Sequence, residues 1–313
     1  MFQCNSHLSR MAIAVALLAC AFDRSPVAHA FQPRMLTSES GAGWEFPPIG
    51  QHIAKNAAAI FISSTLLLGG QPQAATALDP TVSGALQKAI IEASDATYPL
   101  LQALDSTSTA SFSTKVSNVI AKKLNPDRLT NVVDSATSAV LAIPDDRISK
   151  FTTIVEDAYQ GVSSDTCQYI AIPASAIEKV ALSDGLQKVD AEKLSQALEK
   201  VALLQRAVPV SSSADSGGIC LPKSQEALEN IWVGQTELLL SVPKAAKKEL
   251  GERTKSAIRS IPGPEALRLA NDAKNIVTGS GDRKIASRFL QTGQALDKLI
   301  QQDPRFQAFQ SPK

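Results

Sequence analysis

An all-α fold, a multi-helix bundle of about eight amphipathic helices, is predicted by three observations on the amino-acid sequence. Apolar residues recur at intervals of three and four along most of the chain after residue 78. Prolines and glycines fall mainly between these stretches. No stretch alternates polar and apolar residues for long, as a half-buried strand would. With 44% hydrophobic and 19% charged residues, the composition excludes collagen-like, mostly disordered and polytopic membrane proteins.

The first helix is expected over Leu86 to Leu104, and Pro99 should kink or divide it, because proline breaks the hydrogen bonding of a helix interior. The next helix should follow Asn125-Pro126 and end at Ile143-Pro144. Four further amphipathic stretches cover 147–162, 190–208, the segment from Lys223, and 285–300. The N-cap positions that the sequence suggests are Asp127, Asp145, Asp190 and Asp282.

A small, polar segment, Ser211 to Cys220, is the clearest interior linker. It could separate an acidic helical subdomain, 78–210, from a helical subdomain with a basic tail, 222–313. A chain of this length can bury about 70% of its unfolded surface, which suffices for one or two domains.

The N-terminus has the layout of a secretory signal peptide over residues 1–30. Arg10 precedes the apolar run 11–22, and the small residues Ala28 and Ala30 fit the cleavage positions. The next residue is Phe31, followed closely by Pro33. Ala-Phe at this point, with a proline after it, resembles the presequence of plastid proteins in diatoms and related algae with red-derived secondary plastids. The resemblance implies that the import machinery reads Phe31.

A second apolar run, 57–68, is followed by Ala75-Thr76-Ala77 and repeats this layout. The run is shorter than the roughly 20 residues that a membrane span needs. Residues 31–77 therefore resemble a transit region plus a thylakoid-transfer signal, which implies a thylakoid lumen protein that starts near Leu78. The alternative is a secreted protein in which 57–68 is a buried helix or an anchor.

All three histidines, His7, His29 and His52, precede Leu78. Processing at Ala77 would thus leave no histidine for acid–base catalysis or metal ligation. We expect no catalytic residue, metal or cofactor, although an enzyme that works through Lys, Glu, Asp or Tyr stays open.

Two cysteines, Cys167 and Cys220, follow the leader. In an oxidising compartment they are candidates for a structural disulfide. A reversible redox switch and two separate buried thiols are the alternatives.

Charge divides the region after the leader unevenly. Residues 78–243 carry 13 basic and 20 acidic side chains, whereas 244–313 carry 14 basic and 7 acidic ones. The candidate docking residues are Lys244, Lys247, Lys248, Arg253, Lys255 and Arg259. They form either a solvated face paired with the chain's own acidic helices or a docking surface for an acidic protein. We expect no nucleic-acid partner, because aromatic residues are few and not interleaved with the basic ones.

Two functions follow from this sequence. The first is a non-catalytic lumen protein, peripheral to the membrane at most, that serves as an extrinsic or assembly factor of a photosynthetic complex. In general layout it resembles the extrinsic helical-bundle subunits of photosystem II. The second is a lumenal carrier of pigment or lipid, or a histidine-independent enzyme.

Overall fold

The computed structural model describes residues 84–163, 170–211, 216–279 and 282–302. The predicted leader, with Ala28, Ala30, Phe31, Ala75 and Ala77, lies outside the described residues. Within them the all-α prediction is confirmed, and eight of the helices have 15 or more residues.

The secondary structure falls into three runs along the chain. The first run contains α3 (Gly84–Ala103), α4 (Ser106–Lys123), α5 (Pro126–Leu141) and α6 (Asp145–Tyr159). The middle run contains β1 (Ile170–Pro173), α7 (Ala174–Ala181), α8 (Asp184–Gln187), α9 (Ala191–Lys200), α10 (Ala202–Ala207), β2 (Val210–Ser211) and β3 (Ser216–Ile219). The last run contains α11 (Gln225–Ser241), α12 (Lys244–Arg259), α13 (Gly263–Gly279) and α14 (Arg283–Gln302).

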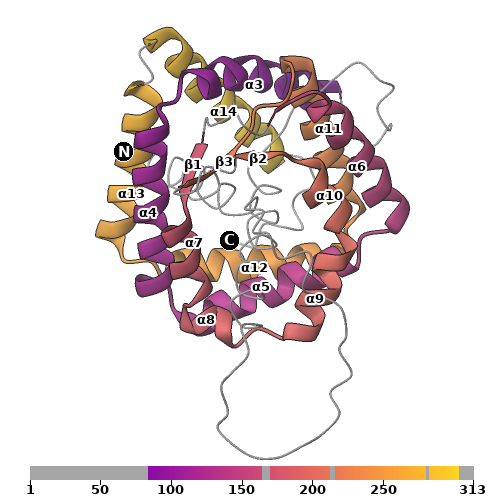
Figure 1. Ribbon diagram of the computed structural model, residues 1–313, viewed down its shortest axis with the longest axis vertical. Coiled ribbons are helices and arrows are strands. Elements are labelled where there is room, and N and C mark those ends of the chain that lie inside the picture. The colour runs from indigo at the N-terminus through magenta and orange to yellow at the C-terminus, as the bar shows by residue number, and fades with distance from the viewer. Residues whose placement is uncertain (1–83, 164–169, 212–215, 280–281, 303–313) are drawn as a thin grey trace, which may run out of the picture.

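The four helices of the first run pack against the four of the last run in reverse order. Helix α3 contacts α14, α4 contacts α13, α5 contacts α12, and α6 contacts α11. The shorter helices α7 to α10 complete the circuit, and Figure 1 shows the helices arranged around a ring. Helices from both predicted subdomains therefore lie next to each other. The division into two subdomains at Ser211 to Cys220 stays a prediction.

One apolar cluster joins the three runs. Val132 and Val133 of α5 are almost fully buried, as are Leu194 of α9 and Leu250 of α12. Burying a side chain of this size stabilises the fold by about 1.5–3 kcal/mol. Because the 3.6-residue repeat places such side chains on one face of each helix, the other face is left to polar residues.

Helix starts are defined by side-chain caps in several places. The prediction is confirmed for Asp190, which accepts from the backbone amides of Glu192 and Lys193 at 3.1 Å, and for Asp282, which accepts from the amide of Lys284 at 2.7 Å. It is wrong for Asp127 and Asp145, which lie in the first turn after the caps Asn125 and Pro144. Acidic residues there still favour the positive end of the helix.

Two expected helix boundaries are also corrected. Pro99 lies inside α3 without dividing it, and the helix continues to Ala103, close to the expected end at Leu104. Ala96 and Leu100 on either side of Pro99 are buried, so packing holds this helix together where propensity alone would weaken it. The segment 190–208 forms two helices, because Val201 leaves helical geometry between α9 and α10.

A small antiparallel sheet, which the sequence did not predict, has the strand order β1-β3-β2. Ile219 of β3 pairs with Ile170 of β1 and with Val210 of β2. The described residues of the predicted linker are thus partly paired as strands. Helix α4 fixes β1 from the side, since Ser113 Oγ donates to the carbonyl of Ala171 at 3.1 Å.

Among the residues described here, none of the helices combines the length and the apolar character that crossing a bilayer requires.

Candidate functional site

Helix α12 carries all six predicted docking residues, and its buried face fixes how they are presented. Leu250, Gly251, Thr254 and Ala257 are buried, and the helix packs against α5. Packing of α12 on α5 therefore fixes the orientation of the opposite, outer face of α12. The position of this face does not depend on the conformation of a loop.

Most of the predicted cations lie on this outer face. Lys244, Lys248, Arg253 and Arg259 are exposed, and Lys255 is half-buried. The ion pairs of the exposed face lie within the helix, with Lys248 3.9 Å from Glu252 and Arg253 3.8 Å from Glu249. Exposed pairs of this spacing contribute about 0.3–0.5 kcal/mol each, so an external acidic group can replace them easily.

The structure corrects the prediction that Lys247 belongs to the docking surface. Its residue is 6% exposed, and its Nζ donates to the carbonyl of Leu240 at 2.9 Å. Burial lowers the pKa of its ammonium group. The residue stands three before Leu250 and seven before Thr254, which places it on the buried face of α12, so it cannot contact a partner.

Two ion pairs connect the acidic half of the sequence, 78–243, with the basic half, 244–313, and both lie outside α12. Lys115 of α4 pairs with Asp272 of α13 at 2.9 Å, and Arg288 of α14 lies 3.6 Å from Asp95 of α3. Charge pairing between the halves therefore exists, but these pairs involve α13 and α14 and do not test the interpretation that the basic face of α12 pairs with the chain's own acidic helices.

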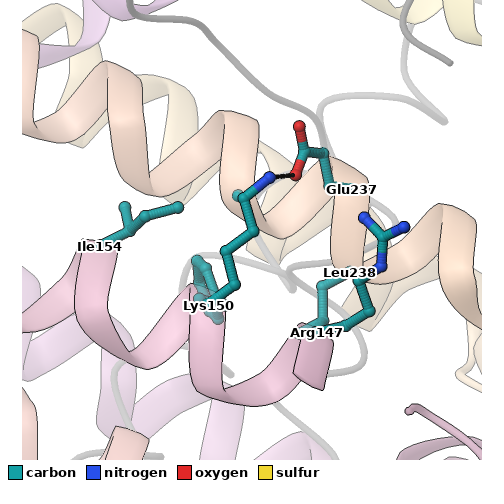
Figure 2. A pocket seen from close by; sticks show the side chains of 7 residues that line it. Arg147, Lys150, Ile154, Glu237 and Leu238 are labelled. Atoms are coloured by element: carbon teal, nitrogen blue, oxygen red, sulfur yellow. Dashed lines mark hydrogen bonds and ion pairs between the residues drawn. The ribbon is translucent and has the colours of Figure 1, made fainter. Parts of the chain in front are cut away.

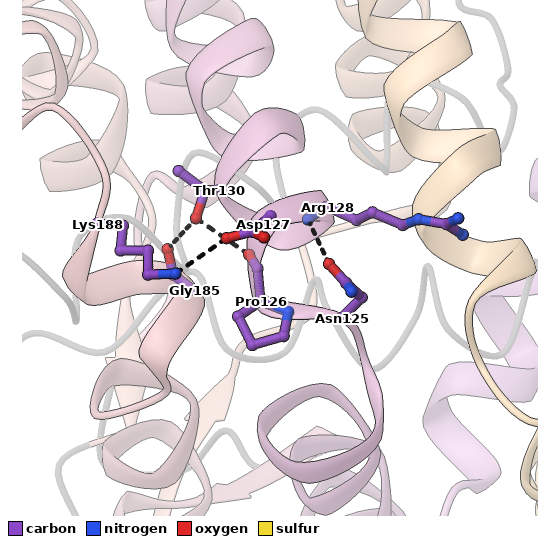
Figure 3. Close-up of polar contacts among 7 residues, drawn as sticks. All are labelled: Asn125, Pro126, Asp127, Arg128, Thr130, Gly185 and Lys188. Atoms are coloured by element: carbon purple, nitrogen blue, oxygen red, sulfur yellow. Dashed lines mark hydrogen bonds and ion pairs between the residues drawn. The ribbon is translucent and has the colours of Figure 1, made fainter.

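A polar junction fixes the start of α5 against α8 (Figure 3). Thr130 Oγ1 donates to the carbonyl of Gly185 at 2.6 Å, and Lys188 Nζ lies 2.9 Å from Asp127 Oδ1. A Cβ at Gly185 would lie 2.7 Å from the carbonyl oxygen of Pro126, so only glycine allows this approach. The hydrogen bond to Asp127 raises the pKa of Lys188.

The same turn of α5 reaches α12. Arg128 Nη1 donates to the carbonyl of Ser256 at 2.8 Å, in the last turns of α12. Arg128 is exposed and belongs to the acidic half of the sequence, so counting charge along the chain did not select it. The junction with α8 thus positions a further cation beside the candidate docking face.

A pocket lies between α6 and α11 (Figure 2). Lys150 and Glu237 point toward each other across it, with Nζ and Oε2 2.6 Å apart. The helices approach closely, because a Cβ at Gly234 would lie 2.6 Å from Phe151 Cδ2. The pocket has a volume of about 10 Å³, roughly the space of a single water. This pocket cannot hold a pigment or a lipid.

Cys220, the cysteine that ends the predicted linker, is fully buried. Tyr159 donates its hydroxyl to the Cys220 carbonyl at 3.1 Å, and burial raises the pKa of that tyrosine. Cys167 lies outside the described residues, so its bond to Cys220 stays a prediction. The described part of the chain gathers no group of three His, Cys, Asp or Glu side chains that could hold a metal.

The site therefore comprises an exposed cationic helix face and the junction that supports it. Compared with known proteins, the chain matches no family model, no curated protein and no solved structure.

Proposed function

We propose that this chain is a non-catalytic protein of the thylakoid lumen that docks by charge on an acidic surface of a photosynthetic complex, as an extrinsic or assembly and stabilising factor. The observation that carries the docking is the outer face of α12. Lys244, Lys248, Arg253 and Arg259 are exposed on it, and the helix is fixed to α5 along its other side.

Such a face suits reversible association. Complementary charges raise the rate of encounter and set the orientation of two partners. Each exposed pair contributes only about 0.2–1 kcal/mol, so several must act together and all weaken as salt rises. A partner held in this way stays peripheral to its complex.

The compartment rests on the leader, whose two consecutive signal layouts resemble those of lumen proteins in diatom-type plastids. The proposed compartment and the cations of α12 both suit the same partner. That partner is an acidic protein surface of a photosystem or another thylakoid complex. The carrier alternative gains no support from the pocket between α6 and α11, which has the volume of about one water.

The test is to express the tagged full-length chain in a diatom and to sequence the N-terminus of the processed form. We expect a start within a few residues of Leu78 and co-migration with a thylakoid complex. Washing opened thylakoids at about 1 M salt, where the screening length falls to about 3 Å, should release the protein. A start at Met1 or Phe31, or retention through the salt wash, would overturn the proposal, as would a pigment or lipid that co-purifies in equal amount.

A further inference from the structure

Basic side chains from three helices gather at one end of the α5–α12 pair. They come from the last turn of α4, the first turn of α5 and the last turns of α12. We infer that this cationic corner is the part of the docking surface that grips the partner, and that it binds a carboxylate-rich protein segment. The cationic corner consists of Lys122, Lys123, Arg128, Lys255 and Arg259. The inference rests on the proposed docking function and locates it.

The chain connection and one hydrogen bond bring the three helix ends together. Lys122 and Lys123 end α4, and only Leu124 and the cap residue Asn125 separate them from α5. Arg128, in the first turn of α5, donates to the carbonyl of Ser256 at 2.8 Å. Ser256 directly follows Lys255 and stands three residues before Arg259, which places both in the same turns of α12.

The cationic corner is exposed. Lys122, Lys123, Arg128 and Arg259 are exposed, and Lys255 is half-buried. The acidic residue within the corner's own segments, Asp127, lies 2.9 Å from Lys188, a cation outside the corner.

The surrounding charges leave the corner strongly positive. The first turns of α13, which follow Arg259 after a short turn, add Glu265 and Arg268, one charge of each sign. The other end of α12 is more balanced, because Glu249 and Glu252 stand among Lys244, Lys248 and Arg253. The excess of positive charge is therefore greatest at the corner.

The residue types point to carboxylates on a protein. Arg128 and Arg259 each carry a planar guanidinium, which can hold a carboxylate through two parallel hydrogen bonds. The bond from Arg128 to Ser256 already fixes one side of its guanidinium and limits the freedom that binding would remove. Single-stranded nucleic acids bind surfaces that combine cations with aromatic platforms, and the segments 122–128 and 255–259 that carry the corner contain no aromatic residue.

The test compares two triple variants with the same change of charge. The corner variant is K122E/K123E/R259E, and the control is K244E/K248E/R253E at the other end of the docking face. Each is measured for binding of a fluorescent polyglutamate peptide by anisotropy and for rebinding to salt-washed thylakoid membranes. Circular dichroism checks the fold, and matching Lys→Gln and Arg→Gln triples replace any variant that fails to fold.

We expect the corner variant to weaken both kinds of binding about tenfold or more, and the control, whose residues belong to the same docking face, by a smaller factor of about three. An equal or larger loss in the control would overturn the corner while leaving charge docking intact. No loss in either variant would overturn both. Tighter binding to phosphatidylglycerol vesicles than to polyglutamate would overturn the carboxylate assignment.

Discussion

Replacing Gly185 by alanine tests how the start of α5 is positioned. The added Cβ would lie 2.7 Å from the Pro126 carbonyl oxygen and 2.9 Å from Leu129 Cβ. Neither is the flexible end of a side chain, so α8 must move away from α5. Overpacking of this kind costs about 1–3 kcal/mol.

The movement should also break the hydrogen bond from Thr130 Oγ1 to the Gly185 carbonyl, now 2.6 Å long. A part-buried hydrogen bond of this kind contributes about 0.5–1.5 kcal/mol net. The two effects together predict a loss of about 2–4 kcal/mol in the free energy of unfolding. For a domain of this size, each kcal/mol lowers Tm by about 2–4 °C, so we expect a fall of at least about 4 °C.

Urea and thermal unfolding of the purified protein measure this loss. The matched control is Gly263→Ala at the start of α13, where an added Cβ would meet nothing within 4 Å. That change should alter stability by less than about 1 kcal/mol. Equal stability of the two variants would refute the close approach of α8 to α5, and with it the account of how Arg128 is held.

Three further results are expected. Leu194→Ala should lower the unfolding free energy by about 2–5 kcal/mol in urea titrations, because Leu194 is fully buried in the core cluster. Burial lowers the pKa of Lys247, so the unfolded chain keeps that proton more readily, and stability should rise as pH increases through the lowered pKa toward about 10.4. Urea unfolding across that range should show a smaller rise for Lys247→Met than for the parent, and an equal rise would contradict this reasoning. If Cys220 bonds Cys167, reduction should cost about 4 kcal/mol, and Cys167→Ser and Cys220→Ser should each lose a similar amount in non-reducing thermal unfolding; a peptide map without the bond would refute the pairing.

The helices were predictable where one face is strongly apolar. Ile148, Phe151 and Val155 repeat at helical spacing, and all three are buried in α6. Such a stripe shows that a face is covered but not which helix covers it, so the reverse-order pairing could not be read from the sequence. Strand β3 was not predicted from the sequence, because Ser216–Ile219 is too short to show an alternating pattern.

The candidate site was predictable in part for a similar reason. The run of basic residues in α12 is visible in the sequence, and the spacing of Lys247 from Leu250 and Thr254 was a signal that it faces inward. Arg128 had no such signal, because 128 residues separate it from its partner Ser256. Proximity of this kind arises only when the chain has folded.

The reverse-order pairing has a consequence for the order of assembly. Helix α3 contacts α14 and α11, both at the far end of the chain, so it lacks these neighbours until synthesis or translocation is almost complete. Contacts so distant along the sequence slow folding, because a long loop must close before they form. If such a chain crosses a membrane pore N-terminus first, α3 would thus remain without its contacts to α11 and α14 during the passage. The ring of helices would be completed only on the far side of the membrane.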